Sequence, residues 1–396
     1  MLADPGTVPD LAAAARAAGR LGIDTEFMGE GRYRPLLCLV QVAVEEQPGG
    51  EARVAVLDPL DRALDPAPLA EVLADPEVEV VLHAGRQDVA LLRRVWRTDV
   101  RNVFDTQIAA GFAGPRAQLG YEPLLHQTLG VRLRKSASFT RWDARPLSAE
   151  QVEYAREDVL HLLQLADALQ EQLSGRGRLE WAREECRAVE EASDERDPDA
   201  LFARLPRVNS LDPSQRAVAR ELVEWRERTA AEADRPATGI LPDAPLVEIA
   251  KRRPRSADRL AQIRGLHEGI LRRRAPAILA AVARGRDRAP IPVEGERPLQ
   301  PEAADAPLIA LGEALVRARA AEAGLAYELI AARADLQRVV TALRTDAPEA
   351  DVRTLRGWRR AVVGAELLEL LQGRRSLRVG DGRRIEVSEP ALDGPG

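Results

Sequence analysis

The sequence predicts an N-terminal α/β domain with a mixed sheet, in which three antiparallel strands precede parallel strands, followed by two all-α helical bundles. Short stretches rich in apolar or β-branched residues alternate with helix-like stretches over residues 1–173. Beyond residue 147 the pattern is helical, and a proline-rich stretch at 286–304 divides the helical part in two. A chain of 396 residues is also longer than a single hydrophobic core usually supports.

Five short segments of the first domain are predicted as strands. The first three follow one another closely, as in antiparallel hairpins. The last two are separated by helix-like segments such as 88–96, as in parallel crossovers. The predicted strands are 21–27, 36–44, 53–58, 78–84 and 103–106.

The remaining chain divides by composition. Ser148 and Gln151 form a predicted capping box, from which a helix should run to about Leu173. We expect six segments: an α/β domain at 1–173, a charged linker at 174–210, a helical bundle at 211–285, a proline-rich linker at 286–304, a second bundle at 305–375 and a tail at 376–396. From Glu386 onward we expect disorder.

Composition excludes several classes of protein. No apolar run approaches the roughly 20 residues that span a bilayer, and the N-terminus lacks the basic-then-apolar pattern of a signal peptide. Cys38 and Cys186 have no CxxC spacing, so they indicate a reducing compartment, the cytoplasm, and no cysteine metal site. With 4 His, a His-rich zinc enzyme is not expected.

Charge is unevenly distributed along the chain. The net charge of −6 argues weakly against a nucleic-acid partner. Residues 201–290, however, contain 19 Lys and Arg against 11 Asp and Glu. A basic module joined to an acidic one suits a nuclease that grips phosphate with one part and holds metal with the other. Solvated arginines on helix surfaces are the alternative interpretation.

Asp24 and Glu26 lie in the first predicted strand. Because alternate side chains of a strand share a face, the two carboxylates point to one side. They repel each other there, and a divalent cation would offset that repulsion. The alternative is a solvent-facing edge strand with two acidic residues.

Two further positions carry acidic or phenolic groups. Asp88 lies at the start of the helix that follows the fourth predicted strand. Its alternative role is structural, as an N-cap or first-turn acid of that helix. Tyr154 and Asp158 are four apart and share one face of a predicted helix. Glu157 also neighbours Tyr154, so spacing alone does not choose between Glu157 and Asp158. A Tyr–Asp surface pair is the alternative.

The ordered set Asp-x-Glu, Asp and Tyr-x-x-x-Asp resembles the DEDDy family of 3′–5′ exonucleases, whose domain is ribonuclease-H-like. Flanking segments resemble ribonuclease D in particular, and they are 34–42, 104–112, 119–121, 135–136 and 142–148. Residues 222–266 resemble the HRDC domain, an auxiliary nucleic-acid-binding bundle shared by RecQ-type helicases and ribonuclease D. Its basic stretches 251–255 and 272–274 would neutralise phosphates. Residues 305–375 resemble the second, HRDC-like bundle of ribonuclease D proteins.

The resemblance implies a 3′–5′ exoribonuclease that uses two Mg²⁺ or Mn²⁺ ions. Hard cations prefer carboxylate oxygen, which fits a constellation without Cys or His. By resemblance, Asp24 bridges both ions, Glu26 and Asp158 complete the site of the ion that activates water, Asp88 supports the second ion, and Tyr154 orients the water. The expected products are nucleoside 5′-monophosphates. The expected substrate is RNA with a single-stranded 3′ end, such as a tRNA precursor, and the expected state is a monomer.

Three other functions remain open at this point. A DNA exonuclease would use the same chemistry, since sugar preference depends on contacts to the 2′-OH. A catalytically silent RNA-binding protein would keep the bundles without turnover. A generic α/β protein would have purely structural acidic residues.

Overall fold

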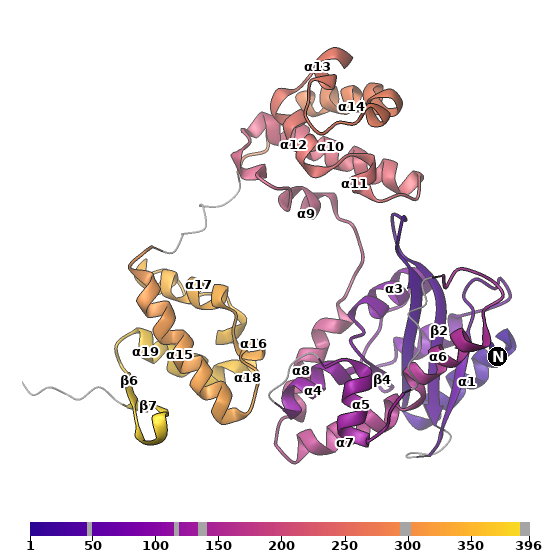
Figure 1. Ribbon diagram of the computed structural model, residues 1–396, viewed down its shortest axis with the longest axis vertical. Helices are drawn as coiled ribbons and strands as arrows, with labels where there is room; N and C mark the ends of the chain where they lie inside the picture. Colours follow the sequence, from indigo (N-terminus) through magenta and orange to yellow (C-terminus); the bar gives the residue numbers. More distant parts are fainter. Residues whose placement is uncertain (46–49, 115–118, 134–140, 294–301, 389–396) are drawn as a thin grey trace, which may run out of the picture.

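The computed structural model describes residues 1–45, 50–114, 119–133, 141–293 and 302–388 (Figure 1). The segment 135–136 that resembles ribonuclease D lies outside the described residues, as do parts of the predicted proline-rich linker and tail. The N-terminal domain contains the sheet, and two helical bundles follow it (Figure 1).

A five-stranded mixed sheet forms the centre of the N-terminal domain. Its strand order is β3-β2-β1-β4-β5, with β1 antiparallel to β2, β2 antiparallel to β3, and β1, β4 and β5 parallel. The strands are β1 Arg20–Met28, β2 Leu36–Glu45, β3 Ala52–Leu57, β4 Glu79–Leu82 and β5 Val103–Asp105. The predicted fold class, three antiparallel strands followed by parallel ones, is confirmed.

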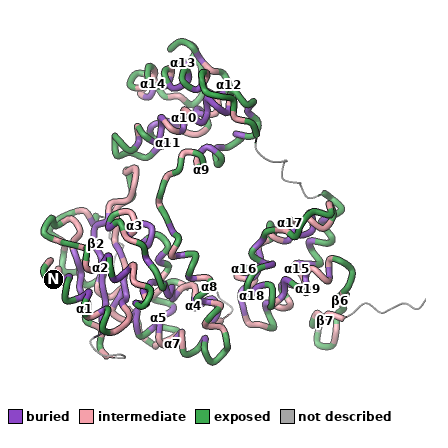
Figure 2. Tube along the Cα trace, turned by 180° about the vertical axis from the view of Figure 1, so that it is seen from behind, coloured by how far each residue is buried: buried purple, intermediate pink, exposed green. Residues whose placement is uncertain are grey.

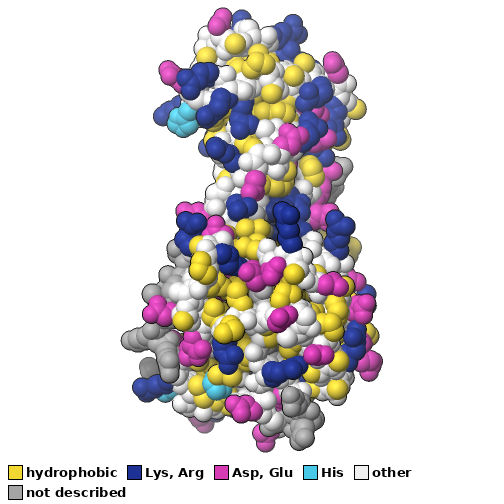
Figure 3. Space-filling view, turned by 90° about the vertical axis from the view of Figure 1, so that its right-hand side faces the viewer, with side chains coloured by type: hydrophobic (Ala, Val, Ile, Leu, Met, Phe, Trp, Pro, Cys, Tyr) yellow, Lys and Arg dark blue, Asp and Glu magenta, His cyan; other side chains and the backbone are white. Residues whose placement is uncertain are grey.

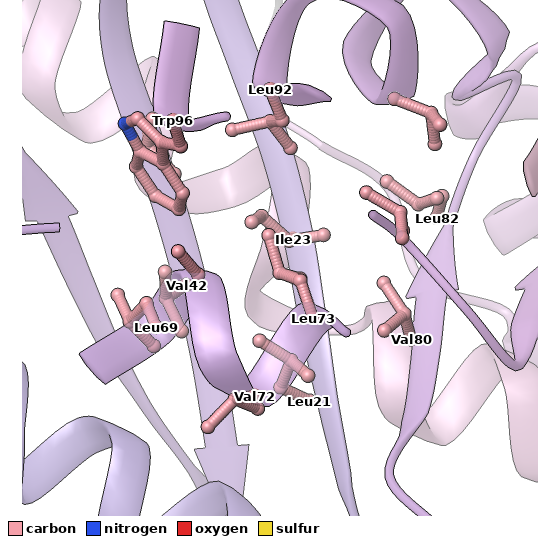
Figure 4. Packing of buried hydrophobic residues seen from close by; sticks show 14 of the residues in the cluster. Leu21, Ile23, Val42, Leu69, Val72, Leu73, Val80, Leu82, Leu92 and Trp96 are labelled. Carbon is pink, nitrogen blue, oxygen red and sulfur yellow. The ribbon is translucent and has the colours of Figure 1, made fainter. Parts of the chain in front are cut away.

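One face of the sheet is covered by α1 Val8–Ala18, α2 Ala67–Leu73 and α3 Arg86–Trp96. Figure 4 shows Leu21 and Ile23 of β1 directed toward Leu73 and Leu92 of these helices. The tube in Figure 2 is coloured as buried along much of the central strands. Since alternate residues face opposite ways, this packing directs Asp24 and Glu26 toward the other face.

The other face is covered by helices from later in the chain, α4 Thr106–Ala113, α5 Tyr121–Leu129, α6 Ala149–Leu160 and α7 Leu162–Ser174. The capping box of Ser148 and Gln151 is present at the start of α6. The single helix expected from there to Leu173 is interrupted at His161, whose φ of −108° and ψ of 8° are not helical. The break lets α6 cover the antiparallel strands while α7 packs on α4 and α5, which one straight helix could not do.

Residues 174–210, expected as a charged linker, contain α8 Leu179–Glu190, α9 Pro198–Ala203 and a 3₁₀ turn at Val208–Ser210. Cys186 and Val189 of α8 are buried in the same hydrophobic cluster as β1. The first half of this segment therefore extends the N-terminal domain, and its charged residues lie on the outer side of an amphipathic helix.

The first bundle contains α10 Pro213–Glu232, α11 Ala237–Ile240, α12 Asp243–Arg252, α13 Ala257–Ala261 and α14 Glu268–Asp287. It has its own core, which includes Trp225. The turn between β1 and β2 reaches this bundle, as the tip of the long hairpin in Figure 1 shows. There Arg32 Nη1 lies 2.8 Å from Asp234 Oδ2, and the Tyr33 hydroxyl donates to Glu227 at 3.2 Å.

The second bundle contains α15 Asp305–Ala323, α16 Tyr327–Ile330, α17 Arg333–Arg344, α18 Gly357–Arg359, a π-helical turn at Arg360–Gly364 and α19 Ala365–Leu371. Its buried residues belong to one cluster with those of α4, α7 and α8. Trp358 stacks on Trp181 with ring centroids 5.4 Å apart and meets Phe112 edge-on at 5.0 Å. This bundle is therefore packed directly on the N-terminal domain.

The expected tail begins with a hairpin of β6 Ser376–Val379 and β7 Ile385–Ser388. Leu377 and Val387 pack against the second bundle. Regular structure therefore continues past Glu386, where disorder was expected. Residues from 389 onward lie outside the described part. Among the described helices, none is long and apolar enough to cross a membrane.

Candidate active site

The strand β1 presents Asp24 and Glu26 to the sheet face that α6 covers. In the antiparallel register Asp24 pairs with Gln41 of β2, and Glu26 pairs with Leu39. A register irregularity follows directly after Glu26, where the strand leaves regular pairing. The local sequence thus places two carboxylates on one face at the carboxyl end of the central strand.

Asp88 enters the site from α3, which follows β4. Gly85 is the N-cap of this helix, so Asp88 occupies its first turn and does not cap it. The Asp88 side chain is 8% exposed and accepts a hydrogen bond from the Thr25 hydroxyl. This contact ties the start of α3 to β1, beside the strand's two carboxylates.

Helix α6 brings Tyr154 and Asp158 over the same face. The charge of Asp158 acts on the pKa values of Asp24, Glu26 and Tyr154, whereas Glu157 acts on Asp158 itself. Of the two acidic residues that spacing left open, Asp158 is thus the one whose charge acts on the strand carboxyl groups. The ring of Tyr154 lies 5.9 Å from that of buried Trp142.

Burial and mutual repulsion raise the pKa values of these carboxyl groups. Burial, followed by the charges of Asp158 and Asp88, raises the pKa of Glu26 to about 8. Burial and then the charge of Glu157 raise the pKa of Asp158 to about 7. The pKa of Asp24 lies well above its ordinary value because of burial and the charges of Asp88, Asp158 and Glu26. The four groups thus form a concentration of negative charge with restricted access to water.

This donor set fits hard divalent cations. Carboxylate oxygens are the ligands that Mg²⁺ and Mn²⁺ prefer, and a cation would offset the repulsion that raises these pKa values. Within the described residues, no three His, Cys, Asp or Glu side chains converge closely enough to hold an ion as they stand. Asp88 accepts a hydrogen bond from the Thr25 hydroxyl in this arrangement.

Three neighbours of the site were not singled out as functional from sequence. Tyr121 of α5 lies near enough to Asp158 and Asp24 for their charges, after burial, to raise its pKa. Its ring lies 5.4 Å from that of His83, whose Nδ1 is 2.9 Å from Thr106 Oγ1. Gln41 is fully buried opposite Asp24. Gln41 and Tyr121 lie in segments that resemble ribonuclease D, and this resemblance was the only sequence signal that could have pointed to them. Their proximity to the site arises from the folding of distant segments.

Comparison with known proteins identifies the family. Residues 2–174 match the model of the 3′–5′ exonuclease domain, and residues 215–282 match that of the HRDC domain. The chain is 38% identical over 373 residues to ribonuclease D of Gluconacetobacter diazotrophicus, covering 92% of this chain and 91% of that protein. The chain belongs to the ribonuclease D family. It is also 35% identical over 398 residues to the ribonuclease D of a Jannaschia species, covering 97% of this chain and 98% of the relative.

Solved structures support the same assignment. The ribonuclease D of Escherichia coli, described as an exoribonuclease involved in structured RNA processing, has a TM-score of 0.80 and 27% identity, covering 94% of this chain and 98% of that one. The catalytic core of RRP6 from Trypanosoma brucei has a TM-score of 0.53 and 26% identity, covering 71% and 78%. This member of the ribonuclease D family is thus a hydrolytic 3′–5′ exoribonuclease, and the generic α/β alternative is excluded.

Proposed function

We propose that this exoribonuclease removes nucleotides from the 3′ end of RNA by two-metal-ion hydrolysis and releases nucleoside 5′-monophosphates. One observation carries the proposal. Asp88 of α3 and Asp158 of α6 lie close enough to Asp24 and Glu26 of β1 that their charges, added to burial, raise the pKa values of both strand carboxyl groups. Such a cluster is unfavourable without a counter-charge, and two Mg²⁺ or Mn²⁺ ions would supply it.

Each carboxylate has a place in this proposal. Asp24, at the centre of the cluster, would contact both ions, while Glu26 and Asp158 would complete one ion's ligands and Asp88 would support the other. Ions held by these carboxylates would supply activation of the attacking water and stabilisation of the leaving oxygen. Removing any one carboxylate would leave an incomplete ligand set in a site whose remaining charges still repel.

Tyr154 would act by hydrogen bonding and not as a base. Burial and the charges of Asp158, Glu26 and Asp24 raise its pKa above its ordinary value, so the phenol keeps its proton at neutral pH. A protonated phenol beside the carboxylates can orient the attacking water. The contact with Trp142 holds the ring in place for that role.

RNA would reach the site along the first bundle. Arg286 near the end of α14 donates a hydrogen bond to the carbonyl oxygen of Arg253, which follows α12. Burial and then the charges of Arg255 and Arg253 lower the pKa of Arg286. Figure 3 shows Lys and Arg side chains over the upper bundle. Neighbouring arginines of this kind attract phosphate groups. We propose a monomer that trims structured RNA such as tRNA precursors in the cytoplasm, where the free, buried Cys38 and Cys186 would stay reduced.

The test uses the full-length protein with 5′-labelled single-stranded RNA and a matching DNA, each with Mg²⁺, Mn²⁺ or EDTA. We expect a metal-dependent ladder that shortens from the 3′ end, faster on RNA, with nucleoside 5′-monophosphates as products. Asp24→Ala should abolish most turnover while the circular dichroism spectrum stays unchanged. Normal activity in Asp24→Ala, with metal still required, would contradict the site. A ladder on DNA alone would move the substrate to DNA, and binding without cleavage would favour a silent RNA-binding protein.

A further inference from the structure

Gln41 is a buried polar residue that the chemistry above does not use. It lies in the middle of β2 with an exposed fraction of 0%. Within the described part of the chain, neither its Nε2 nor its Oε1 has a hydrogen-bond partner. Buried amides are rarely left in this state, because an unpaired buried donor or acceptor lowers stability. Such a group in a native protein requires an explanation.

The surroundings of Gln41 show what it faces. Across one neighbouring strand it pairs with Asp24 of β1, and across the other it pairs with Val56 of β3. Directly paired residues of antiparallel strands project to the same face with their Cβ atoms about 4.5–5.5 Å apart. Of these two neighbours, Asp24 has a hydrogen-bond acceptor and Val56 has none.

Helix α6 covers the face of the sheet onto which Gln41 projects. Val56 and Leu39 belong to one buried cluster with Ala155, which lies between Tyr154 and Asp158 in the helix. The positions around Gln41 are therefore apolar except on the side of the carboxylates. A residue needed only for packing here would be apolar, as Leu39 and Val56 are, so the amide points to a function at the site.

We propose that Gln41 is a positioning residue whose side-chain amide donates a hydrogen bond to the Asp24 carboxylate and orients it for the divalent cation. The proposal rests on the proposed function, since it concerns the same carboxylates. Each oxygen of a carboxylate has two lone pairs, so an oxygen of Asp24 that contacts a cation can still accept a hydrogen bond from Gln41. Residues that hold a metal ligand in this way strengthen metal binding without touching the metal.

The test compares Gln41→Met, which keeps the length of the side chain, and Gln41→Leu with wild type. Val42→Ala is the matched control, because Val42 is the next residue of β2 and is buried on the opposite face. Mn²⁺ binding is measured by isothermal titration on the full-length protein, and thermal unfolding is measured in EDTA. We expect both Gln41 variants to bind Mn²⁺ at least about tenfold more weakly and to melt in EDTA no lower than wild type. Val42→Ala should melt lower and bind Mn²⁺ normally.

The outcomes separate this inference from the function on which it depends. Gln41 variants that bind Mn²⁺ as wild type does, whether or not they melt lower in EDTA, would overturn the positioning role. A failure of the metal site itself would give a different result: wild type and Asp24→Asn would then bind Mn²⁺ equally, or neither would bind. The catalytic rate constant should fall in Gln41→Met while KM for RNA stays unchanged, which a general loss of structure would not produce.

Discussion

Replacing Glu26 by Gln should stabilise the metal-free protein at pH 8 and have little effect at pH 5. The pKa of Glu26 rises from 4.5 to about 8 through burial and then the charges of Asp158 and Asp88. A carboxyl with a higher pKa in the folded protein binds its proton more tightly when folded. Its contribution to stability therefore falls as pH rises from about 4.5 to about 8. Glutamine has the same shape and no charge to bury.

The size of the effect follows from the same pKa values. At about 1.4 kcal/mol for each tenfold change in proton affinity, the rise from 4.5 to about 8 gives a limit of about 5 kcal/mol above pH 8. Solvent screening at a side chain that is not fully buried reduces this to roughly 2–3 kcal/mol. For a domain of this size that is a rise of about 5–10 °C in melting temperature.

The assay is thermal unfolding of wild type and Glu26→Gln in EDTA at pH 5 and pH 8, with Glu30→Gln as the control. Glu30 is exposed at the end of the β1–β2 turn nearest to β1, so its substitution should change nothing. Adding Mn²⁺ should stabilise wild type more than the variant and close the gap at pH 8. If Glu26→Gln melts no higher than wild type at pH 8 in EDTA, or gains equally at both pH values, then Glu26 does not bear the repulsion described.

Three further predictions concern other parts of the molecule. Tyr154→Phe should lower the catalytic rate constant about 10–100-fold while Mn²⁺ affinity, measured by titration, stays unchanged; a matching loss of metal binding would contradict the orienting role. Trp358→Ala should destabilise the N-terminal domain by about 3–5 kcal/mol in denaturant unfolding, because the Trp358 ring of the second bundle packs on Trp181 and Phe112 of that domain. Substituting Arg253, Arg255 and Arg286 together by Ala should reduce the salt dependence of RNA binding by about 2 in the slope of log K against log salt, and an unchanged slope would place the RNA elsewhere.

Local sequence determined the elements of this protein because each has a short-range cause. The five strands, the capping box at Ser148 and the placement of Asp24 and Glu26 on one strand face follow from periodicity and spacing over a few residues. The family resemblance followed from the order of the motifs, and the comparisons confirmed it. The break at His161 was missed because it arises from packing on two different surfaces, which helix periodicity does not encode.

Contacts between distant segments were decided by the tertiary structure alone. Spacing left Asp158 and Glu157 both open, and the resemblance assigned Asp158; which of the two acts on Glu26 depends on how α6 lies across the sheet. The pairing of Gln41 with Asp24 depends on strand register. The second bundle packs on the N-terminal domain through Trp358 and Trp181, although the sequence between the domains suggested separate modules. Sequence patterns report each segment's own apolar face, whereas the partner of that face is set by the packing of the whole chain.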